Sequence, residues 1–269
     1  MMKSIRLPPD MKSGRKLSRQ SSESNLFGMD WRIHHKSVTE STNKDALGGK
    51  PGDVFVADMQ TAGRGRLDHR WLSAPGENLM MSAVVDVADV PPQEAATLPL
   101  IAGLAVALAV SGVFSRSGNP SKASDVKIKW PNDVLIAGRK ICGILCERSG
   151  DSVIVGIGVN VNQTAFPPEI SQRATSLRLE LGFSHDVDSV RDGVLDRLSE
   201  CIERWRQNGF AALLPELSTF DCLKGQRVAV RRTDDDAVPA DGLCGGIRPD
   251  GMLDVAGEAI SAGEAHVIA

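Results

Sequence analysis

A glycine- and arginine-rich segment is the part of this sequence best suited to bind an anion. It reads Gln60-Thr61-Ala62-Gly63-Arg64-Gly65-Arg66 and follows a β-rich run at residues 54–57. Glycine allows the backbone to approach a ligand closely and to point its N–H groups at an anion. Arginine adds a planar set of donors that suits a carboxylate or a phosphate. Such a loop could enclose a ligand and release it, although its spacing alone fits a solvated turn equally well.

A second candidate is a lysine at the end of a predicted strand, in the segment Lys127-Ile128-Lys129-Trp130-Pro131-Asn132-Asp133. Alternation along the strand places both lysines on one face, and Pro131 ends the strand. A lysine beside a tight turn can meet an anion as a point charge. We interpret Lys127 as a surface lysine. Whether Lys129 is a surface or a site residue depends on the Trp-Pro-Asn-Asp segment that follows it, because of the resemblance described below.

A third segment has glycines inside a predicted strand, at Gly156 and Gly158. Glycine weakens a strand unless something packs closely against its backbone. Asn160 and Asn162 would share a face and could hydrogen-bond an adenine edge or a polar ligand group. The alternative is a bulge with two surface asparagines.

The elements that must position these residues alternate between strands and helices. Strands are predicted at residues 31–38, 54–57, 78–87, 126–130, 134–136, 140–146 and 153–161. One helix is predicted to begin at residue 44, and others are predicted at 97–114, 189–206 and 211–217. Residues 119–125 are predicted to form a loop. Paired strands before and after helices favour an α+β fold over a parallel doubly wound sheet. Residues 225–230 and 246–255 indicate a small all-β module. We therefore predict a disordered leader (1–30), a catalytic domain (31–220) and a C-terminal domain (221–269).

Composition narrows the class of protein. The 269 residues are 42% hydrophobic, and a net charge of -3 with a pI near 6.0 gives little support for a nucleic-acid role. Five cysteines without a Cys-x-x-Cys pair suggest reduced thiols in a cytoplasmic protein. The segment 97–114 approaches the length of a membrane span, but its small residues and Pro99 favour a buried core helix.

Taken together, these motifs resemble the catalytic core of biotin–protein ligases. The matching stretches, in the family's order, are Ser41-Thr42-Asn43, residues 60–66, residues 129–133, Arg139-Lys140 with Gly143-Ile144-Leu145, and residues 156–162. The resemblance covers residues 31–180 well and the C-terminal module loosely. It implies a central mixed β-sheet with flanking helices, as in class II synthetases and biotin/lipoate ligases, followed by an SH3-like β-barrel.

The resemblance also implies a reaction and a set of site residues. Biotin and ATP would give biotinyl-5′-AMP, and a lysine of a biotin carboxyl carrier domain of a biotin-dependent carboxylase would then accept the biotin. Mg²⁺ is expected with ATP, although no acidic cluster in the sequence suggests a metal site. Lys129 and Arg66 are the expected catalytic residues. The implied biotin contacts are Ser41, Thr42, Asn43, Gln60, Arg64, Gly65, Arg66 and Lys129, with Asn132, Gly143 and Asn160 on the nucleotide side.

The chain also departs from the family's pattern. After Arg66 it continues Leu67-Asp68-His69, where Asp68 reduces the positive charge that many members carry. The polar stretch before Trp31 leaves no room for the DNA-binding domain of some members, so we predict no DNA binding and no membrane association. A homodimer built by pairing sheet edges is a further expectation. The alternatives are a lipoate–protein ligase or octanoyl transferase, and a non-catalytic biotin-binding protein.

Overall fold

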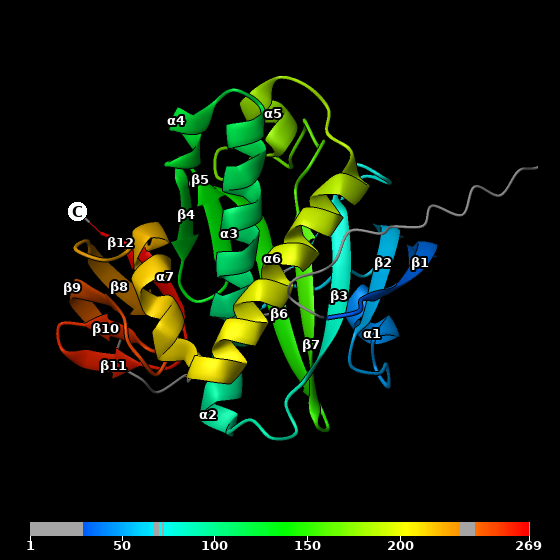
Figure 1. Ribbon diagram of the computed structural model, residues 1–269. Coiled ribbons are helices and arrows are strands. Elements are labelled where there is room, and N and C mark those ends of the chain that lie inside the picture. The colour runs from blue at the N-terminus through cyan, green and yellow to red at the C-terminus, as the bar shows by residue number, and fades with distance from the viewer. Residues whose placement is uncertain (1–28, 67–69, 72, 232–239, 269) are drawn as a thin grey trace, which may run out of the picture.

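A seven-stranded mixed sheet forms the larger part of the molecule (Figure 1). The computed structural model describes residues 29–66, 70–71, 73–231 and 240–268, so nearly all of the predicted leader and Leu67–His69 lie outside it. The strand order is β1-β2-β3-β7-β6-β5-β4, with β1 and β2 parallel and the other pairs antiparallel. The strands are β1 (Arg32–Thr39), β2 (Asp53–Gln60), β3 (Leu79–Asp86), β4 (Val126–Lys129), β5 (Asp133–Ile136), β6 (Arg139–Ser149) and β7 (Ser152–Val159). The predicted α+β fold with a central mixed sheet is confirmed.

Two long helices, α3 (Leu98–Arg116) and α6 (Val187–Asn208), cross one face of this sheet (Figure 1). The helical segment Pro92–Arg116, which contains α3, is apolar and long enough to span a membrane, but 72% of its most apolar 18 residues are buried inside the protein. α3 packs against strands β4 to β7 and against α6, as predicted for a core helix. α6 buries one apolar stripe, which includes Val190, Val194, Leu198 and Ile202. The helices therefore leave the opposite face of the sheet available for a site.

Short helices fill the connections. They are α1 (Thr42–Asp45), α2 (Pro92–Ala95), α4 (Pro120–Ala123), α5 (Leu177–Leu181), η1 (Phe210–Leu213) and α7 (Leu214–Phe220). The prediction of a loop at 119–125 was wrong for Pro120–Ala123, which form the short helix α4. Pro120 starts that helical turn, because its fixed φ and missing N–H suit the first turn of a helix.

A second, five-stranded antiparallel sheet follows α7. Its order is β11-β10-β9-β8-β12, built from β8 (Arg227–Arg231), β9 (Ala240–Ile247), β10 (Leu253–Val255), β11 (Glu258–Ile260) and β12 (Glu264–Val267). The sequence indicated the strands of β8, β9 and β10, but not the short β11 and β12. The two sheets share one apolar core, and Trp130 Nε1 donates a hydrogen bond to the Gly251 carbonyl at 3.1 Å. The C-terminal sheet is therefore fixed beside the end of β4.

Candidate active site

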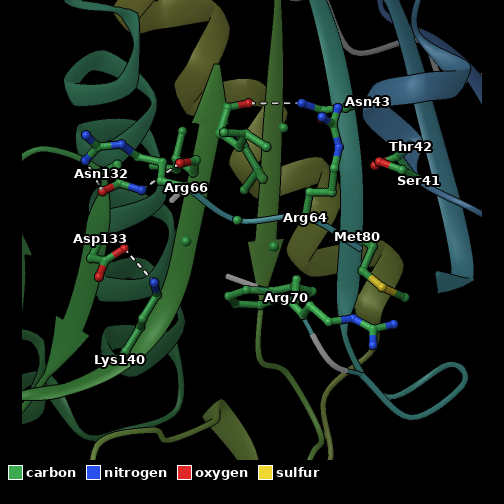
Figure 2. Close-up of a pocket in the computed structure, with 18 of the residues that line it drawn as sticks. Ser41, Thr42, Asn43, Arg64, Arg66, Arg70, Met80, Asn132, Asp133 and Lys140 are labelled. Atoms are coloured by element: carbon green, nitrogen blue, oxygen red, sulfur yellow. Dashed lines mark hydrogen bonds and ion pairs between the residues drawn. The ribbon is translucent and has the colours of Figure 1, made fainter. Parts of the chain in front are cut away.

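A single cavity on the face away from α3 collects nearly all of the predicted site residues (Figure 2). Ile128 and Ile144 point toward α3, where they approach Gly103. Their neighbours in the strands therefore face the other way. Ten of the eleven predicted residues line the cavity: Ser41, Thr42, Asn43, Gln60, Arg64, Gly65, Arg66, Lys129, Asn132 and Gly143.

The turn at Ser41–Asn43 is held from two sides. The backbone N–H and the hydroxyl of Thr42 donate to Gln60 Oε1, at 2.7 and 3.1 Å. Asn43 Nδ2 donates to the Leu145 carbonyl at 3.2 Å and to Glu147 at 2.6 Å. The Ser41 hydroxyl, by contrast, makes no hydrogen bond within the described residues. Ser41 is therefore the hydroxyl of this turn that is left for a ligand.

A backbone hydrogen bond holds the start of the glycine/arginine loop, and the side chains of Arg64 and Arg66 bind to different parts of the protein. Trp71 N donates to the Gly63 carbonyl at 3.0 Å. Arg64 Nη2 donates to both carboxylate oxygens of Glu147, at 2.8 Å each. At the opposite end of the cavity, Arg66 Nη1 donates to Asn132 Oδ1 at 3.2 Å and to the Gly263 carbonyl at 3.4 Å. The loop thus reaches across the sheet from β6 to the C-terminal module.

The two lysines of β4 have different surroundings. Lys127 Nζ donates to the Thr219 carbonyl at 3.0 Å. Lys129 is half-buried, lines the cavity and makes no hydrogen bond or ion pair with the residues that the structure describes. The interpretation of Lys127 as a residue outside the site agrees with this arrangement. Lys129 offers an ammonium group to a bound anion.

The cavity is electropositive in a protein of net negative charge. Its lining contains five basic side chains and two acidic ones: Arg64, Arg66, Arg70, Lys129, Lys140, Asp133 and Glu264. Lys140 pairs with Asp133 at 2.7 Å. Burial lowers the pKa of Arg66, and the nearby carboxylates of Asp133 and Glu264 oppose that shift. Glu147, which lies outside the lining, pairs with Arg64, so a surplus of two positive charges remains. A positive surplus inside a partly enclosed site favours anionic ligands.

Glycines form part of the cavity wall because large side chains lie directly on them. A Cβ at Gly156 would collide with the Asn43 amide, and one at Gly143 would lie 3.0 Å from Trp71 Cζ3. The close approach predicted for the glycine strand is therefore confirmed. Sequence reasoning missed Trp71 itself, although the glycines signalled that some group had to pack there.

Asn160 lies outside the cavity lining. It is buried, its N–H donates to the Ile141 carbonyl, and its Nδ2 donates to the Thr175 carbonyl at 3.0 Å. These bonds connect the end of β7 to the segment before α5. The structure thus places ten predicted residues together and this one apart.

Comparison with known proteins agrees with this geometry. Residues 35–163 match the biotin/lipoate A/B protein ligase family. The chain is 36% identical over 211 residues to a biotin–[acetyl-CoA-carboxylase] ligase of Mycobacterium tuberculosis, covering 76% of each chain. The chain belongs to the biotin protein ligase family. A structure of the biotin protein ligase of Aquifex aeolicus in complex with biotin and ATP superimposes with a TM-score of 0.74 at 30% identity, covering 88% of this chain and 98% of that one.

Other members of the biotin protein ligase family are longer. The chain is 38% identical over 188 residues to the bifunctional ligase/repressor BirA of Bacillus spizizenii. That match covers 65% of this chain and 54% of the relative. The chain thus spans about half the length of that relative.

Proposed function

We propose that the protein activates biotin with ATP as biotinyl-5′-AMP and transfers it to a lysine of a biotin carboxyl carrier domain. The observation that carries this proposal is the ammonium of Lys129, which has no partner among the described residues and lies in an electropositive cavity that also holds the Ser41–Asn43 turn. A neutral, polar ring could bind at the turn, while a carboxylate and a phosphate bind near Lys129. The identity of the relatives supports biotin as the acid.

The first step joins two anions that repel one another. Biotin's carboxylate oxygen attacks the α-phosphorus of ATP, a P–O bond to the β-phosphate breaks, and pyrophosphate leaves. Lys129 and Arg66 supply positive charge where negative charge gathers in the transition state. Arg64 already has a carboxylate partner in Glu147, so it serves mainly to hold the loop. The remaining contribution is the alignment of the reacting groups.

The second step transfers the activated acyl group. The amine of the carrier's lysine attacks the carbonyl carbon of the mixed anhydride, a C–N bond forms, the C–O bond to phosphate breaks, and AMP leaves. The anhydride is prone to hydrolysis, so the site must exclude water from it. The described part of the loop, Gly63–Arg66, can contribute to this exclusion, because the Gly63 carbonyl accepts a hydrogen bond from Trp71 N and the side chains of Arg64 and Arg66 are anchored around the cavity.

Mg²⁺ belongs to this proposal as a companion of ATP. Among the described residues, no group of three or more His, Cys, Asp or Glu side chains could hold a metal ion. Of the two carboxylates that line the cavity, Asp133 is already paired with Lys140. The described residues therefore do not form a protein metal site, and the triphosphate itself would supply most of the ligands.

The choice of acid is tested by offering biotin or lipoate as the sole acyl donor. The purified protein should form an acid-labile adenylate with biotin and transfer biotin to a carrier domain in the presence of ATP and Mg²⁺. A carrier domain whose acceptor lysine is replaced by arginine is the control. Activity with lipoate alone would contradict the proposal in favour of a lipoate–protein ligase.

The remaining expectations concern assembly and location. We propose a homodimer through a sheet edge, because β1 is a terminal strand of the larger sheet and most of its residues are exposed. Sedimentation with and without biotin and ATP tests that assembly. The cytoplasmic location and the lack of DNA binding stay predictions.

A further inference from the structure

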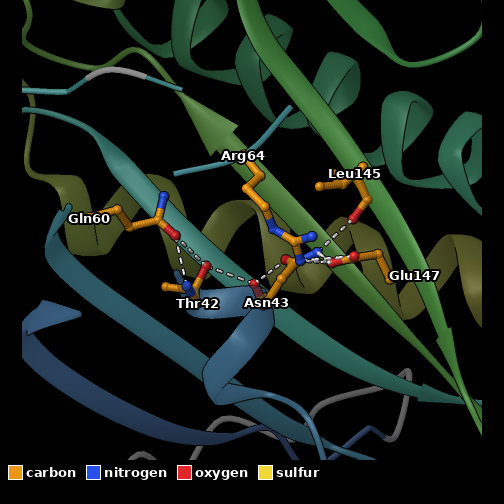
Figure 3. Close-up of polar contacts among 7 residues, drawn as sticks. Thr42, Asn43, Gln60, Arg64, Leu145 and Glu147 are labelled. Carbon is orange, nitrogen blue, oxygen red and sulfur yellow. Dashed lines mark hydrogen bonds and ion pairs between the residues drawn. The ribbon is translucent and has the colours of Figure 1, made fainter. Parts of the chain in front are cut away.

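One carboxylate, that of Glu147, holds two separate parts of the site (Figure 3). Glu147 lies on β6, and its Oε2 accepts a hydrogen bond from Asn43 Nδ2 at 2.6 Å. Both of its oxygens also accept from Arg64 Nη2 at 2.8 Å. Asn43 belongs to the turn that follows β1, and Arg64 belongs to the loop that follows β2. Asn43 and Arg64 lie 21 positions apart in the sequence and thus both bind to one residue of a third segment, Glu147 on β6.

The contacts around Asn43 leave its amide no freedom to turn. Nδ2 has its two hydrogens directed to Glu147 and to the Leu145 carbonyl, and Oδ1 lies 2.6 Å from Ser82 Oγ. Gly156 packs directly beneath this amide. Asn43 is also 4% exposed, so solvent cannot readily replace a lost partner. The Glu147 carboxylate is therefore one of the groups that fix the orientation of the Asn43 amide.

Arg64 has the opposite character, because its side chain is about half exposed (53%). An exposed ion pair contributes little to the stability of the fold. Its effect here is instead on the position of the loop, since Arg64 is flanked by Gly63 and Gly65 and its ion pair with Glu147 joins this part of the loop to β6. A carboxylate shared with the buried Asn43 gives the loop a fixed point beside the turn.

We propose that Glu147 is a positioning residue that couples the glycine/arginine loop to the Ser41–Asn43 turn. The site then binds biotin and retains biotinyl-5′-AMP only when the loop and the turn are both in place. This proposal rests on the proposed function, because it assigns biotin to the turn and the adenylate to the loop. Glu147 is not among the residues that line the cavity. It acts through Asn43 and Arg64 rather than by touching the substrate.

A double-mutant cycle on biotin binding tests the coupling. Glu147→Gln keeps the shape of the side chain but removes its charge, and its effect on the biotin dissociation constant is measured by calorimetry. We expect binding to weaken about tenfold in the wild-type background. In the Arg64→Ala background we expect the same substitution to weaken binding by about threefold or less. Equal losses in both backgrounds, or no loss in either, would overturn the proposal.

The matched control is Glu216→Gln. Glu216 pairs with Arg204 at 2.6 Å and has a similar exposure, 35% against 33% for Glu147, but lies on α7 away from the cavity. It should leave biotin binding unchanged. Thermal unfolding of each variant detects misfolding, and if Glu147→Gln fails to fold, Glu147→Asp takes its place in the cycle.

A second readout follows the adenylate. Preformed biotinyl-5′-AMP should leave the Glu147→Gln protein at least about fivefold faster than the wild type, which loss of a merely structural contact would not cause. Release at the wild-type rate would contradict the coupling. If the wild type itself forms no adenylate from biotin and ATP, the proposed function fails. If the wild type forms it and the variant binds and retains it normally, only the role of Glu147 fails.

Discussion

The indole of Trp71 lies so close to Gly158 that a Cβ at Gly158 would be 2.5 Å from Trp71 Cε2. Real side chains do not tolerate such a separation, so a methyl group there must displace the ring. The two residues come from the segment after β2 and from β7, and both line the cavity. Their contact forms part of the cavity wall.

Gly158→Ala should therefore lower both the stability of the fold and the activity. Displacing the indole at an overpacked position costs roughly 1–3 kcal/mol, and we expect the catalytic efficiency of adenylate formation to fall at least about fivefold. The control is Gly193→Ala, where no heavy atom lies within 4 Å of the added Cβ. Because Gly193 lies inside α6, alanine should stabilise the fold by up to about 1 kcal/mol without changing the rate. Equal effects of the two variants on the rate would contradict this view of Trp71.

Lys129→Ala should reduce transfer of biotin to a carrier domain at least about tenfold, equivalent to about 1.4 kcal/mol of barrier. The reason is the loss from the cavity of an ammonium that no described residue pairs with. Lys127→Ala is the matched control, because Lys127 lies two residues away on the same strand but bonds to the Thr219 carbonyl. Steady-state transfer rates of the two variants provide the comparison. A wild-type rate for Lys129→Ala would remove Lys129 from the mechanism.

Asp53 should make the stability of the fold depend on pH in a defined window. A hydrogen bond with His34, assisted by the Lys50 N–H and by Arg32, lowers the pKa of Asp53 from 3.8 to about 2. Because the folded-state pKa is the lower one, this stabilisation is present above about pH 4 and is lost as the pH falls toward 2. Urea unfolding of wild type and Asp53→Asn should thus differ at pH 5 and converge near pH 2.

Asp241→Asn is the control for that comparison, since Asp241 forms an exposed pair with Arg227. It should unfold like the wild type at both pH values. A constant difference between wild type and Asp53→Asn across the whole range would show that the carboxylate charge is not the cause.

The five cysteines should be free and slow to react in the native protein. All five are unpaired, and burial raises the pKa of Cys146 and Cys201 to about 12 and that of Cys222 to about 11. A thiol reacts as its thiolate, so a thiol reagent at pH 8 should label the folded protein slowly and label five groups quickly in urea. Fewer than five groups in unfolded, unreduced protein would indicate a disulfide.

The sequence was informative where local pattern and local physics agree. Pro131 ends β4 as predicted, a nearly continuous apolar run located α3, and the apolar spacing located α6. The resemblance to the family, rather than any one motif, selected Lys129 over Lys127. The glycines of β7 predicted a close contact without naming the residue that makes it.

What could not be predicted depends on contacts between distant parts of the chain. Trp71 and Gly158 lie 87 positions apart in the sequence, and Glu264 reaches the cavity from the C-terminal sheet. Asn160 shows a second limit. The alternation of side chains holds only inside a strand, and β7 ends at Val159, so the face of Asn160 is set by its bonds to Ile141 and Thr175 instead.

Biotin-dependent exchange of labelled pyrophosphate into ATP tests the central claim most directly, because it reports the first step without any carrier protein. We predict that the purified protein catalyses this exchange with biotin and Mg²⁺, and that the exchange disappears when biotin is omitted. A protein that binds biotin but catalyses no exchange would be a biotin-binding protein rather than a ligase, and that result would contradict the account.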